Sequence, residues 1–205
     1  MITLLIVDDQ MSMCDALTQA FTKTGRFRIS GVLSQAQLAP VFVRRYHPDL
    51  ILMDVCTEGN ASGLSATRDI KTRYPETKII VMTAFDEVTY LPRARELGAD
   101  GFVYKKQSLR YFIETADKVL KGEKCFPPPR TIPMPMGELP LTPREMDVLR
   151  LVCKHMTNKE IGEALFISES TVKYHKSNML AKTGFKKTVD LAFYMITKGW
   201  INPLY

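Results

Sequence analysis

The sequence lacks the features of a secreted, disulfide-stabilised or membrane-spanning protein. Its 205 residues include four widely separated cysteines and three histidines, with no spacing typical of a metal site. No apolar run approaches the roughly 20 residues that a membrane-spanning helix needs, and the N-terminus lacks the parts of a secretory signal. We therefore expect a cytoplasmic protein with reduced thiols, and neither a disulfide framework nor a zinc site.

Proline is scarce except in one segment. Seven of the chain's twelve prolines stand between Phe126 and Pro143. Such a segment can neither continue a helix nor join a β-ladder, so we expect an extended, semi-rigid linker at 123–140. Strand and helix patterns alternate before it, and only helical patterns follow it. The sequence thus predicts two domains, residues 1–122 and 141–205.

Short apolar segments of the first domain predict strands, and helical patterns lie between them. The strands are expected near 2–7, 28–33, 50–53, 78–82 and 101–104. The helices are expected near 10–24, 34–46, 63–74, 86–97 and 107–121. Strict alternation of this kind predicts an α/β fold, a doubly wound five-stranded parallel sheet with helices on both faces.

Polar residues of a chemically matched set follow four of these strands. They are Asp8 and Asp9, Asp54, Thr83, and Lys105. Ligands of parallel sheets bind outside the carboxyl ends of the strands, so we expect these side chains to converge. Each alone has an ordinary explanation, because an Asp after a strand commonly caps a helix and a lone lysine is commonly solvated. Their coincidence at successive strand ends favours a functional site.

The set has the composition of a phosphoryl-transfer site. Mg²⁺ prefers oxygen ligands, and the three aspartates supply three carboxylates. With the ion offsetting their repulsion, Asp54 is a candidate nucleophile toward a phosphoryl group. Lys105 supplies a positive charge to the phosphate, and the Thr83 hydroxyl supplies a hydrogen bond.

On these residues, the first domain resembles the flavodoxin-like receiver domain of bacterial two-component response regulators. The resemblance implies that Asp8 and Asp9 bind Mg²⁺ and that Asp54 accepts phosphate from a sensor histidine kinase. It also implies a further Mg²⁺ ligand, the backbone carbonyl of Cys56. Phe102 would be the aromatic switch residue, which turns inward as the hydroxyl after the fourth strand moves to the phosphate.

The loop after Asp54 departs from the family pattern. Thr57-Glu58 replaces the usual Met-Pro, and the next glycine of the pattern, Gly63, stands one residue later than usual. Loss of proline's fixed φ and gain of glycine predict a longer and more flexible loop.

A second departure concerns loss of the phosphate. In this family the positions two beyond the acceptor and two beyond the hydroxyl flank the path of an attacking water, and here they are Cys56 and Phe85. Neither side chain orients water well, so we expect slow self-dephosphorylation.

The second domain is predicted to be a small four-helix domain. Thr142 caps its first helix, with Pro143 at the first position and Glu145 at the capping-box position. Further helices are expected near 158–165, 169–182 and 187–198. The two middle helices and their tight turn make a helix-turn-helix candidate, and residues 125–205 carry 11 Lys/Arg against 7 Asp/Glu. A helical protein-binding bundle has the same periodicity.

Three segments of this domain, 141–145, 158–162 and 167–173, resemble the LuxR-type DNA-binding domain. The resemblance implies base-facing positions for Lys173, Tyr174 and Ser177. It implies phosphate or backbone contacts for Asn158, Lys159, Thr171 and Lys176. The last helix resembles the family's dimerisation helix, with Leu191, Phe193 and Tyr194.

The two resemblances together indicate a NarL/FixJ-type response regulator, a phosphorylation-controlled DNA-binding transcription regulator. Its expected partners are Mg²⁺, a sensor histidine kinase, a two-fold symmetric DNA site and, when phosphorylated, a second copy. We expect no enzyme activity beyond self-dephosphorylation. One alternative is a receiver controlled by a partner or ligand without phosphorylation, to which the altered loop gives weight. Another is a phosphatase, which lacks an acid/base carboxylate at Cys56 and leaves 141–205 unexplained.

Overall fold

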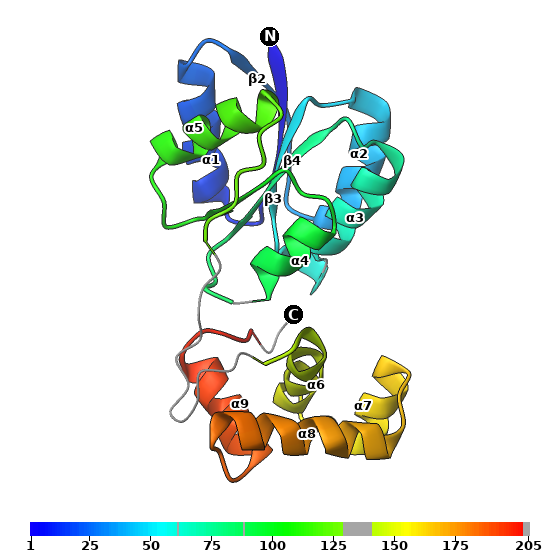
Figure 1. Ribbon diagram of the computed structural model, residues 1–205. Coiled ribbons are helices and arrows are strands. Elements are labelled where there is room, and N and C mark those ends of the chain that lie inside the picture. The colour runs from blue at the N-terminus through cyan, green and yellow to red at the C-terminus, as the bar shows by residue number, and fades with distance from the viewer. Residues whose placement is uncertain (61, 88, 129–140, 203–205) are drawn as a thin grey trace. The chain divides into compact units, whose positions relative to one another are not determined.

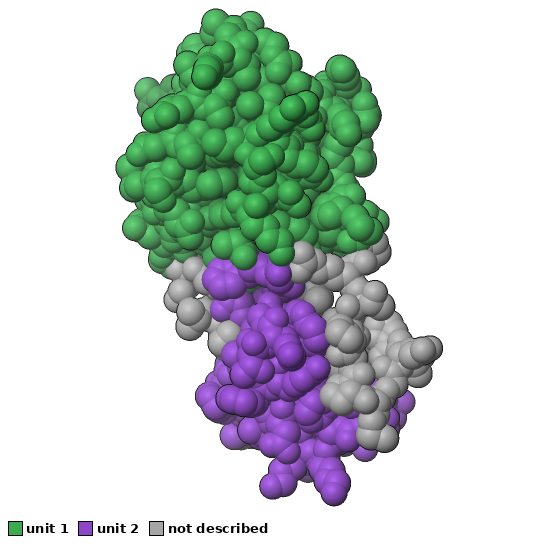
Figure 2. Space-filling view, turned by 90° about the vertical axis from the view of Figure 1, so that its left-hand side faces the viewer, with its two compact units in different colours: residues 1–84, 90–128, 205 green, residues 85–89, 129–204 purple. Residues whose placement is uncertain are grey.

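The computed structural model describes residues 1–60, 62–87, 89–128 and 141–202. They form two compact units, each with its own hydrophobic core (Figure 2). The first unit contains the described residues of 1–84 and 90–128. The second contains those of 85–89 and 129–204. Most of the predicted linker, 129–140, lies outside the described residues.

The first unit is a parallel sheet covered by helices on both faces (Figure 1). Its strands are β1 (Ile2–Val7), β2 (Phe27–Leu33), β3 (Leu50–Asp54), β4 (Lys78–Thr83) and β5 (Gly101–Tyr104). Their order is β2-β1-β3-β4-β5, and every pair is parallel. All residues of β3 and β5 are buried, as short apolar runs covered on both faces require. The predicted five-stranded doubly wound sheet is confirmed.

Five α-helices of the described chain cover this sheet. They are α1 (Met11–Lys23), α2 (Ala39–Tyr46), α3 (Gly63–Arg73), α4 (Tyr90–Glu96) and α5 (Leu109–Leu120). Alternate strand residues point to opposite faces. Leu4 and Ile6 therefore pack with α1 and α5, whereas Leu5 and Val7 pack with α2, α3 and α4. The ribbon shows α1 and α5 on one face of the sheet and α2, α3 and α4 on the other (Figure 1).

Two helices begin later than the sequence pattern predicts, and proline explains both. Pro40 and Pro92 would lie in the interior of helices over 34–46 and 86–97, where each would lack a needed N–H. In the structure, α2 begins at Ala39 after a short 3₁₀ turn (Ala36–Leu38), and α4 begins at Tyr90. Both prolines then fall in the first turn, where backbone N–H groups have no partner within the helix.

The second unit contains four α-helices in its described part (Figure 1). They are α6 (Pro143–Cys153), α7 (Asn158–Leu165), α8 (Glu169–Thr183) and α9 (Thr188–Thr197). Thr142 and Glu145 form the predicted capping box of α6. Thr157 and Glu160 form a second capping box at the start of α7. The predicted four-helix domain is confirmed.

The described residues can be searched for a membrane-spanning helix and for disulfide bonds. No helix among them has the length and apolar character needed to cross a bilayer. All four cysteines lie in the described part of the chain and are free thiols. Burial, with the nearby Asp8 carboxylate, raises the pKa of Cys14 to about 11, so this thiol is protonated at neutral pH.

Candidate functional site

The polar residues at the strand ends converge as the sequence predicts. The Lys105 ammonium donates hydrogen bonds to Asp8 Oδ1 at 2.9 Å and to Asp54 Oδ2 at 2.8 Å. Carboxylate oxygens of Asp8, Asp9 and Asp54 all lie within 4.8 Å of one another. Residues from three separate strands therefore form one acidic site neutralised in part by one lysine.

The sheet register brings these residues to one edge. Asp54 ends β3 opposite Met82, the residue before Thr83. Thr83 ends β4 opposite Tyr104, and its carbonyl accepts a hydrogen bond from the Lys105 N–H at 2.7 Å. Thr83 is fully buried and occupies the end of the strand beside Asp54.

The acidic site suits a divalent cation. Asp8 and Asp54 are 1% and 3% exposed, so their charges are poorly solvated. Asp8 Oδ2 is buried and has no hydrogen-bond partner among the described residues, although a buried carboxylate oxygen normally has one. Clustered carboxylate oxygens are the ligands that Mg²⁺ prefers. We conclude that the three aspartates fit such an ion.

The pKa of the Asp54 carboxyl lies near neutral pH. Burial is the largest influence and raises its pKa, and the Asp8 charge adds to this effect. Lys105 and a backbone hydrogen bond from Cys56 act in the opposite direction, and the resulting pKa is about 7. A bound cation would favour the ionised form, because a nearby positive charge lowers a carboxyl pKa.

The Lys105 ammonium is held in its charged form. Burial alone would lower its pKa, but the Asp54 and Asp8 carboxylates outweigh burial and raise it. Its side chain is only 6% exposed, so this charge is directed at the site rather than at solvent. The lysine is therefore placed to meet an anion bonded to Asp54.

The altered loop after Asp54 is tied to the segment after β2. The buried Thr57 hydroxyl accepts a hydrogen bond from the Ala36 N–H at 3.0 Å. The Glu58 carboxylate accepts one from the Ser34 hydroxyl at 3.2 Å. The residues that replace Met-Pro thus anchor the loop, and the predicted flexibility of the loop stays a prediction.

Gly63 ends this loop in close contact with the backbone of Asp54. Its N–H donates to the Val55 carbonyl at 2.9 Å. A Cβ atom at position 63 would lie 1.9 Å from the Asp54 carbonyl oxygen. Only glycine permits this close approach of the two backbones.

Two residues assigned only through the family resemblance are placed beside the site or in its core. Phe102 is 1% exposed and its ring packs edge-on against Tyr104, with centroids 5.3 Å apart. Cys56 lies 3.6 Å from the Tyr90 hydroxyl through its sulfur atom. The aromatic residue is in its inward position here, and the role of the Cys56 carbonyl as a metal ligand stays a prediction.

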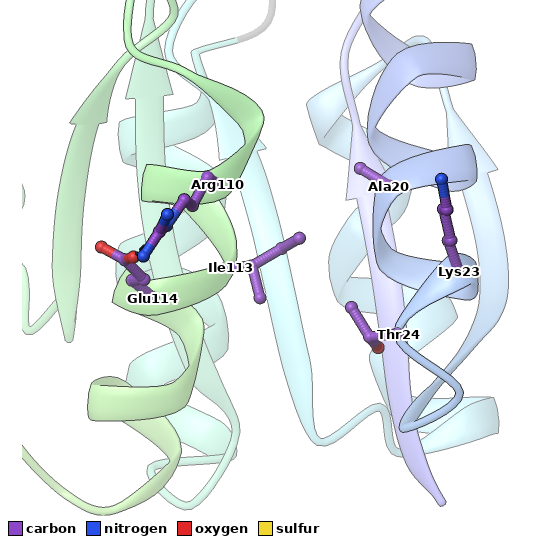
Figure 3. Close-up of a pocket in the computed structure, with 6 residues that line it drawn as sticks. All are labelled: Ala20, Lys23, Thr24, Arg110, Ile113 and Glu114. Carbon is purple, nitrogen blue, oxygen red and sulfur yellow. Dashed lines mark hydrogen bonds and ion pairs between the residues drawn. The ribbon is translucent and has the colours of Figure 1, made fainter.

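A surface pocket between α1 and α5 is separate from the acidic site. In Figure 3, Ile113 of α5 points toward α1 between the two helices. The pocket is lined by Ala20, Lys23, Thr24, Arg110, Ile113 and Glu114. None of the strand-end residues lines it, so it takes no part in the chemistry described above.

The second unit presents the predicted base-facing residues on one side of α8. Lys173, Tyr174 and Ser177 are exposed, and Tyr174 is 64% exposed. Val172 and Met179 of the same helix are buried in the core. An exposed polar stripe opposite a buried apolar face is what a recognition helix requires.

The predicted phosphate contacts fall into two groups. Lys159 is exposed, whereas Asn158, Thr171 and Lys176 are half-buried. The structure brings two of them together, because the Lys176 ammonium donates to Asn158 Oδ1 at 2.6 Å. This hydrogen bond joins the middle of α8 to the start of α7. Burial lowers the pKa of Lys176.

The turn between α7 and α8 contains a residue whose exposure the sequence did not reveal. Phe166 is 96% exposed and has a left-handed backbone (φ 54°, ψ 46°). Arg144 donates to the preceding Leu165 carbonyl at 2.7 Å, and the Ile167 N–H donates to the Gly162 carbonyl at 2.9 Å. These bonds hold the turn, which fixes the direction in which α8 begins.

The predicted dimerisation residues of α9 require a correction. Leu191 is fully buried in the core of its own unit and cannot form a surface contact. Tyr194 is half-buried and packs against Trp200. Phe193 and Val189, four residues apart, are 69% and 66% exposed. The large apolar side chains that α9 exposes are therefore Val189 and Phe193.

Both units match known protein families. Residues 4–117 match the response regulator receiver domain, and residues 139–195 match the luxR family of bacterial regulatory proteins. The chain belongs to the two-component response regulator family. It combines a receiver domain with a LuxR-type DNA-binding domain, so it is a DNA-binding transcription regulator.

Two relatives agree with this family assignment, and a solved structure shares the fold. Transcriptional regulatory protein DegU of Brevibacillus brevis is 28% identical over 226 residues, which cover 98% of this chain and 95% of DegU. Oxygen regulatory protein NreC of Staphylococcus aureus is 33% identical over 172 residues, which cover 76% of this chain and 79% of NreC. A solved structure of two RcsB dimers bound to two parallel DNAs has a TM-score of 0.66 at 20% identity, with 96% and 98% of the two chains covered.

Proposed function

We propose that this response regulator is switched by phosphorylation of Asp54. The observation that carries the proposal is the placement of that carboxylate. It is buried, bonded by Lys105 and clustered with two further aspartates at the carboxyl edge of the sheet. A carboxylate in such a site can act as a nucleophile toward a phosphoryl group.

Mg²⁺ is the proposed cofactor, held by Asp8, Asp9, Asp54 and the backbone carbonyl of Cys56. The ion supplies neutralisation of the charge on the phosphoryl oxygens. The orphaned Asp8 Oδ2 supports this assignment, because a cation would satisfy it.

The phosphoryl group would come from a histidine of a sensor kinase. An Asp54 carboxylate oxygen attacks phosphorus as the bond from phosphorus to the imidazole nitrogen breaks, and the nitrogen keeps that electron pair. Lys105, which already contacts Asp54, meets the new negative charge. Thr83 would move to contact the phosphoryl group through its hydroxyl, and Phe102, which is buried in this structure, is the proposed aromatic switch residue that faces inward when Asp54 is phosphorylated.

The proposed output is binding to double-stranded DNA. α8 would enter the major groove, with Lys173, Tyr174 and Ser177 facing bases. Asn158, Lys159, Thr171 and Lys176 would contact the DNA backbone. RcsB, which shares this fold, is bound to DNA as dimers in its solved structure. By analogy we propose a homodimer of this chain when it is phosphorylated, on a two-fold symmetric DNA site. Such a regulator acts where the DNA is, in the cytoplasm of a bacterial cell.

Phosphorylation is tested by incubating the full chain with Mg²⁺ and acetyl phosphate. Intact mass should increase by one phosphoryl group in the wild type and should not increase in Asp54→Asn. Omission of Mg²⁺ should prevent the modification. A correctly folded wild type that is never modified, yet binds DNA in response to a protein or small-molecule partner, would favour the phosphate-independent receiver.

A further inference from the structure

The edge of the receiver sheet beside Phe102 is covered by the chain's own segment after α5. β5 is the last strand of the sheet, so the backbone groups on its outer side have no strand partner. Residues Lys124–Phe126, here called the edge segment, lie along this side. Cys125 forms a parallel bridge with Gly101. The edge segment therefore belongs to the receiver unit rather than to a free linker.

Two backbone hydrogen bonds attach the edge segment to β5 and to the residue before it. The Phe102 N–H donates to the Cys125 carbonyl at 2.8 Å. The Cys125 N–H donates to the Asp100 carbonyl at 2.9 Å. The approach is close, because a Cβ atom on Gly101 would lie 3.2 Å from the Cys125 carbonyl oxygen. The switch residue is thus bonded directly to the edge segment.

Side chains at both ends of the edge segment fix its position. The Lys124 ammonium donates to the Ala99 carbonyl at 3.0 Å and to Asp100 Oδ1 at 2.9 Å. The Phe126 ring lies under the Arg95 guanidinium of α4, 4.8 Å from the ring centroid. Phe126 also packs against the core cluster that contains Phe102, Tyr90 and other residues of α4.

The edge segment therefore contacts β5 and α4, and β5 ends at the acidic site. β5 leads directly into Lys105, and its Tyr104 pairs with Thr83. Thr83 and Lys105 are thus bonded to the same strand that Cys125 is bonded to, so a movement of either residue acts on that strand. Pro127 and Pro128 follow the edge segment at once, and their rings fix φ at these two positions.

We propose that the edge segment couples the phosphoryl site to the DNA-binding domain. This inference rests on the proposed function. The pairing of the edge segment with β5 differs in strength between the unphosphorylated and phosphorylated receiver, and the DNA-binding domain responds to this difference. Phosphate then alters DNA binding only while the edge segment is paired.

A matched pair of substitutions at Cys125 tests the backbone contact. Cys125→Pro removes the N–H that bonds the Asp100 carbonyl, whereas Cys125→Ala keeps it. Phe126→Ala removes no backbone donor but takes away the ring that holds the segment against Arg95 and the core, so it should loosen the pairing with β5. Each full-length variant is treated with Mg²⁺ and acetyl phosphate, and Asp54 phosphorylation is verified by mass.

The readout is the ratio of DNA affinities with and without phosphate, on a DNA sequence that the phosphorylated wild type selects from a random pool. Allosteric couplings typically amount to about 5–150-fold. Cys125→Ala should keep the wild-type ratio. Cys125→Pro and Phe126→Ala should take phosphate normally and lower the ratio to about 2 or less.

The outcomes separate this inference from the proposed function. Phosphorylated Cys125→Pro and Phe126→Ala variants that keep the wild-type ratio contradict the inference alone. If Cys125→Pro does not fold, Phe126→Ala decides. A wild type that takes no phosphate, or whose affinity does not change with phosphate, contradicts the proposed function and this inference with it. Amide exchange at Phe102 gives a second measure, since its rate should differ between the two states of the wild type.

Discussion

The Asp54 carboxyl is buried, accepts a hydrogen bond from Lys105 and lies near the Asp8 carboxylate. Burial and Asp8 oppose its ionisation, and Lys105 favours it. The balance gives a group that is only partly charged near pH 7 until a cation binds. The ionisation of Asp54 therefore depends on whether a cation is bound beside it.

The first prediction concerns pH. The pKa of Asp54 is about 7 in the folded protein, above the ordinary 3.8. The folded state then binds more protons than the unfolded state between these values, so metal-free stability should fall as pH rises from about 4 through about 7. Asp54→Asn should remove this loss, on the order of 2 kcal/mol, in urea unfolding at pH 5 and pH 8.

The control for this experiment is Asp69→Asn. Asp69 is a half-exposed surface residue paired with Arg68, so its substitution should leave the pH dependence unchanged. Added Mg²⁺ should stabilise the wild type at pH 8 more than Asp54→Asn. An Asp54→Asn variant with the full wild-type pH dependence would contradict the assigned environment of Asp54.

The second prediction concerns Gly63. A methyl group at this position meets the Asp54 carbonyl at 1.9 Å, and a backbone atom cannot move aside cheaply. Gly63→Ala should therefore cost on the order of 2–4 kcal/mol of unfolding free energy and slow phosphorylation. Ser62→Ala is the neighbouring control, because the Ser62 side chain makes no capping hydrogen bond. Wild-type stability of Gly63→Ala would show that the loop closes differently.

Helices and strands were predictable where the pattern was local and less so where it depended on neighbours. The apolar runs identified all five strands, and the strand-end residues identified the acidic site. The late starts of α2 and α4 follow from Pro40 and Pro92. The pairing of Cys125 with β5 was not predictable, because one bridged residue carries no periodic signal. Leu191 was assigned to the dimer contact through the family resemblance, which does not reveal which apolar residue of the helix faces the core.

The third prediction separates the two faces of α9. Leu191→Ala leaves a cavity in a fully packed core and should cost about 2–5 kcal/mol of unfolding free energy. Phe193→Ala removes a ring that is 69% exposed and should change stability little. Phe193→Ala should instead reduce dimers of the phosphorylated protein in sedimentation experiments. Unchanged dimerisation of Phe193→Ala would place the partner contact elsewhere.

The fourth prediction concerns α8. Lys176→Met removes an ammonium that bonds Asn158 and is proposed to meet a phosphate. It should weaken binding to all DNA sequences and lower the slope of log affinity against log salt by about 1. Tyr174→Ala should instead change which sequences are selected from a random pool. Equal effects of the two substitutions on sequence preference would contradict the division into phosphate and base contacts.

The molecule as a whole joins the proposed phosphoryl-acceptor site at Asp54 to a LuxR-type DNA-binding domain within one chain. Each domain is recognisable from its own residues, and the family matches confirm both. We propose that the two domains are coupled, so that phosphorylation of Asp54 changes the affinity of the second domain for DNA. Such a switch is a population shift, limited by how much better phosphate fits the active state.

The most direct test is DNA affinity measured with and without acetyl phosphate, in the presence of Mg²⁺, for wild type and Asp54→Asn. The DNA is a sequence selected by the phosphorylated wild type. We predict at least an approximately fivefold change in wild-type affinity on phosphorylation, within the typical range of about 5–150-fold, and none in Asp54→Asn. Equal responses of the two proteins, or a phosphorylated wild type with unchanged affinity, would contradict it.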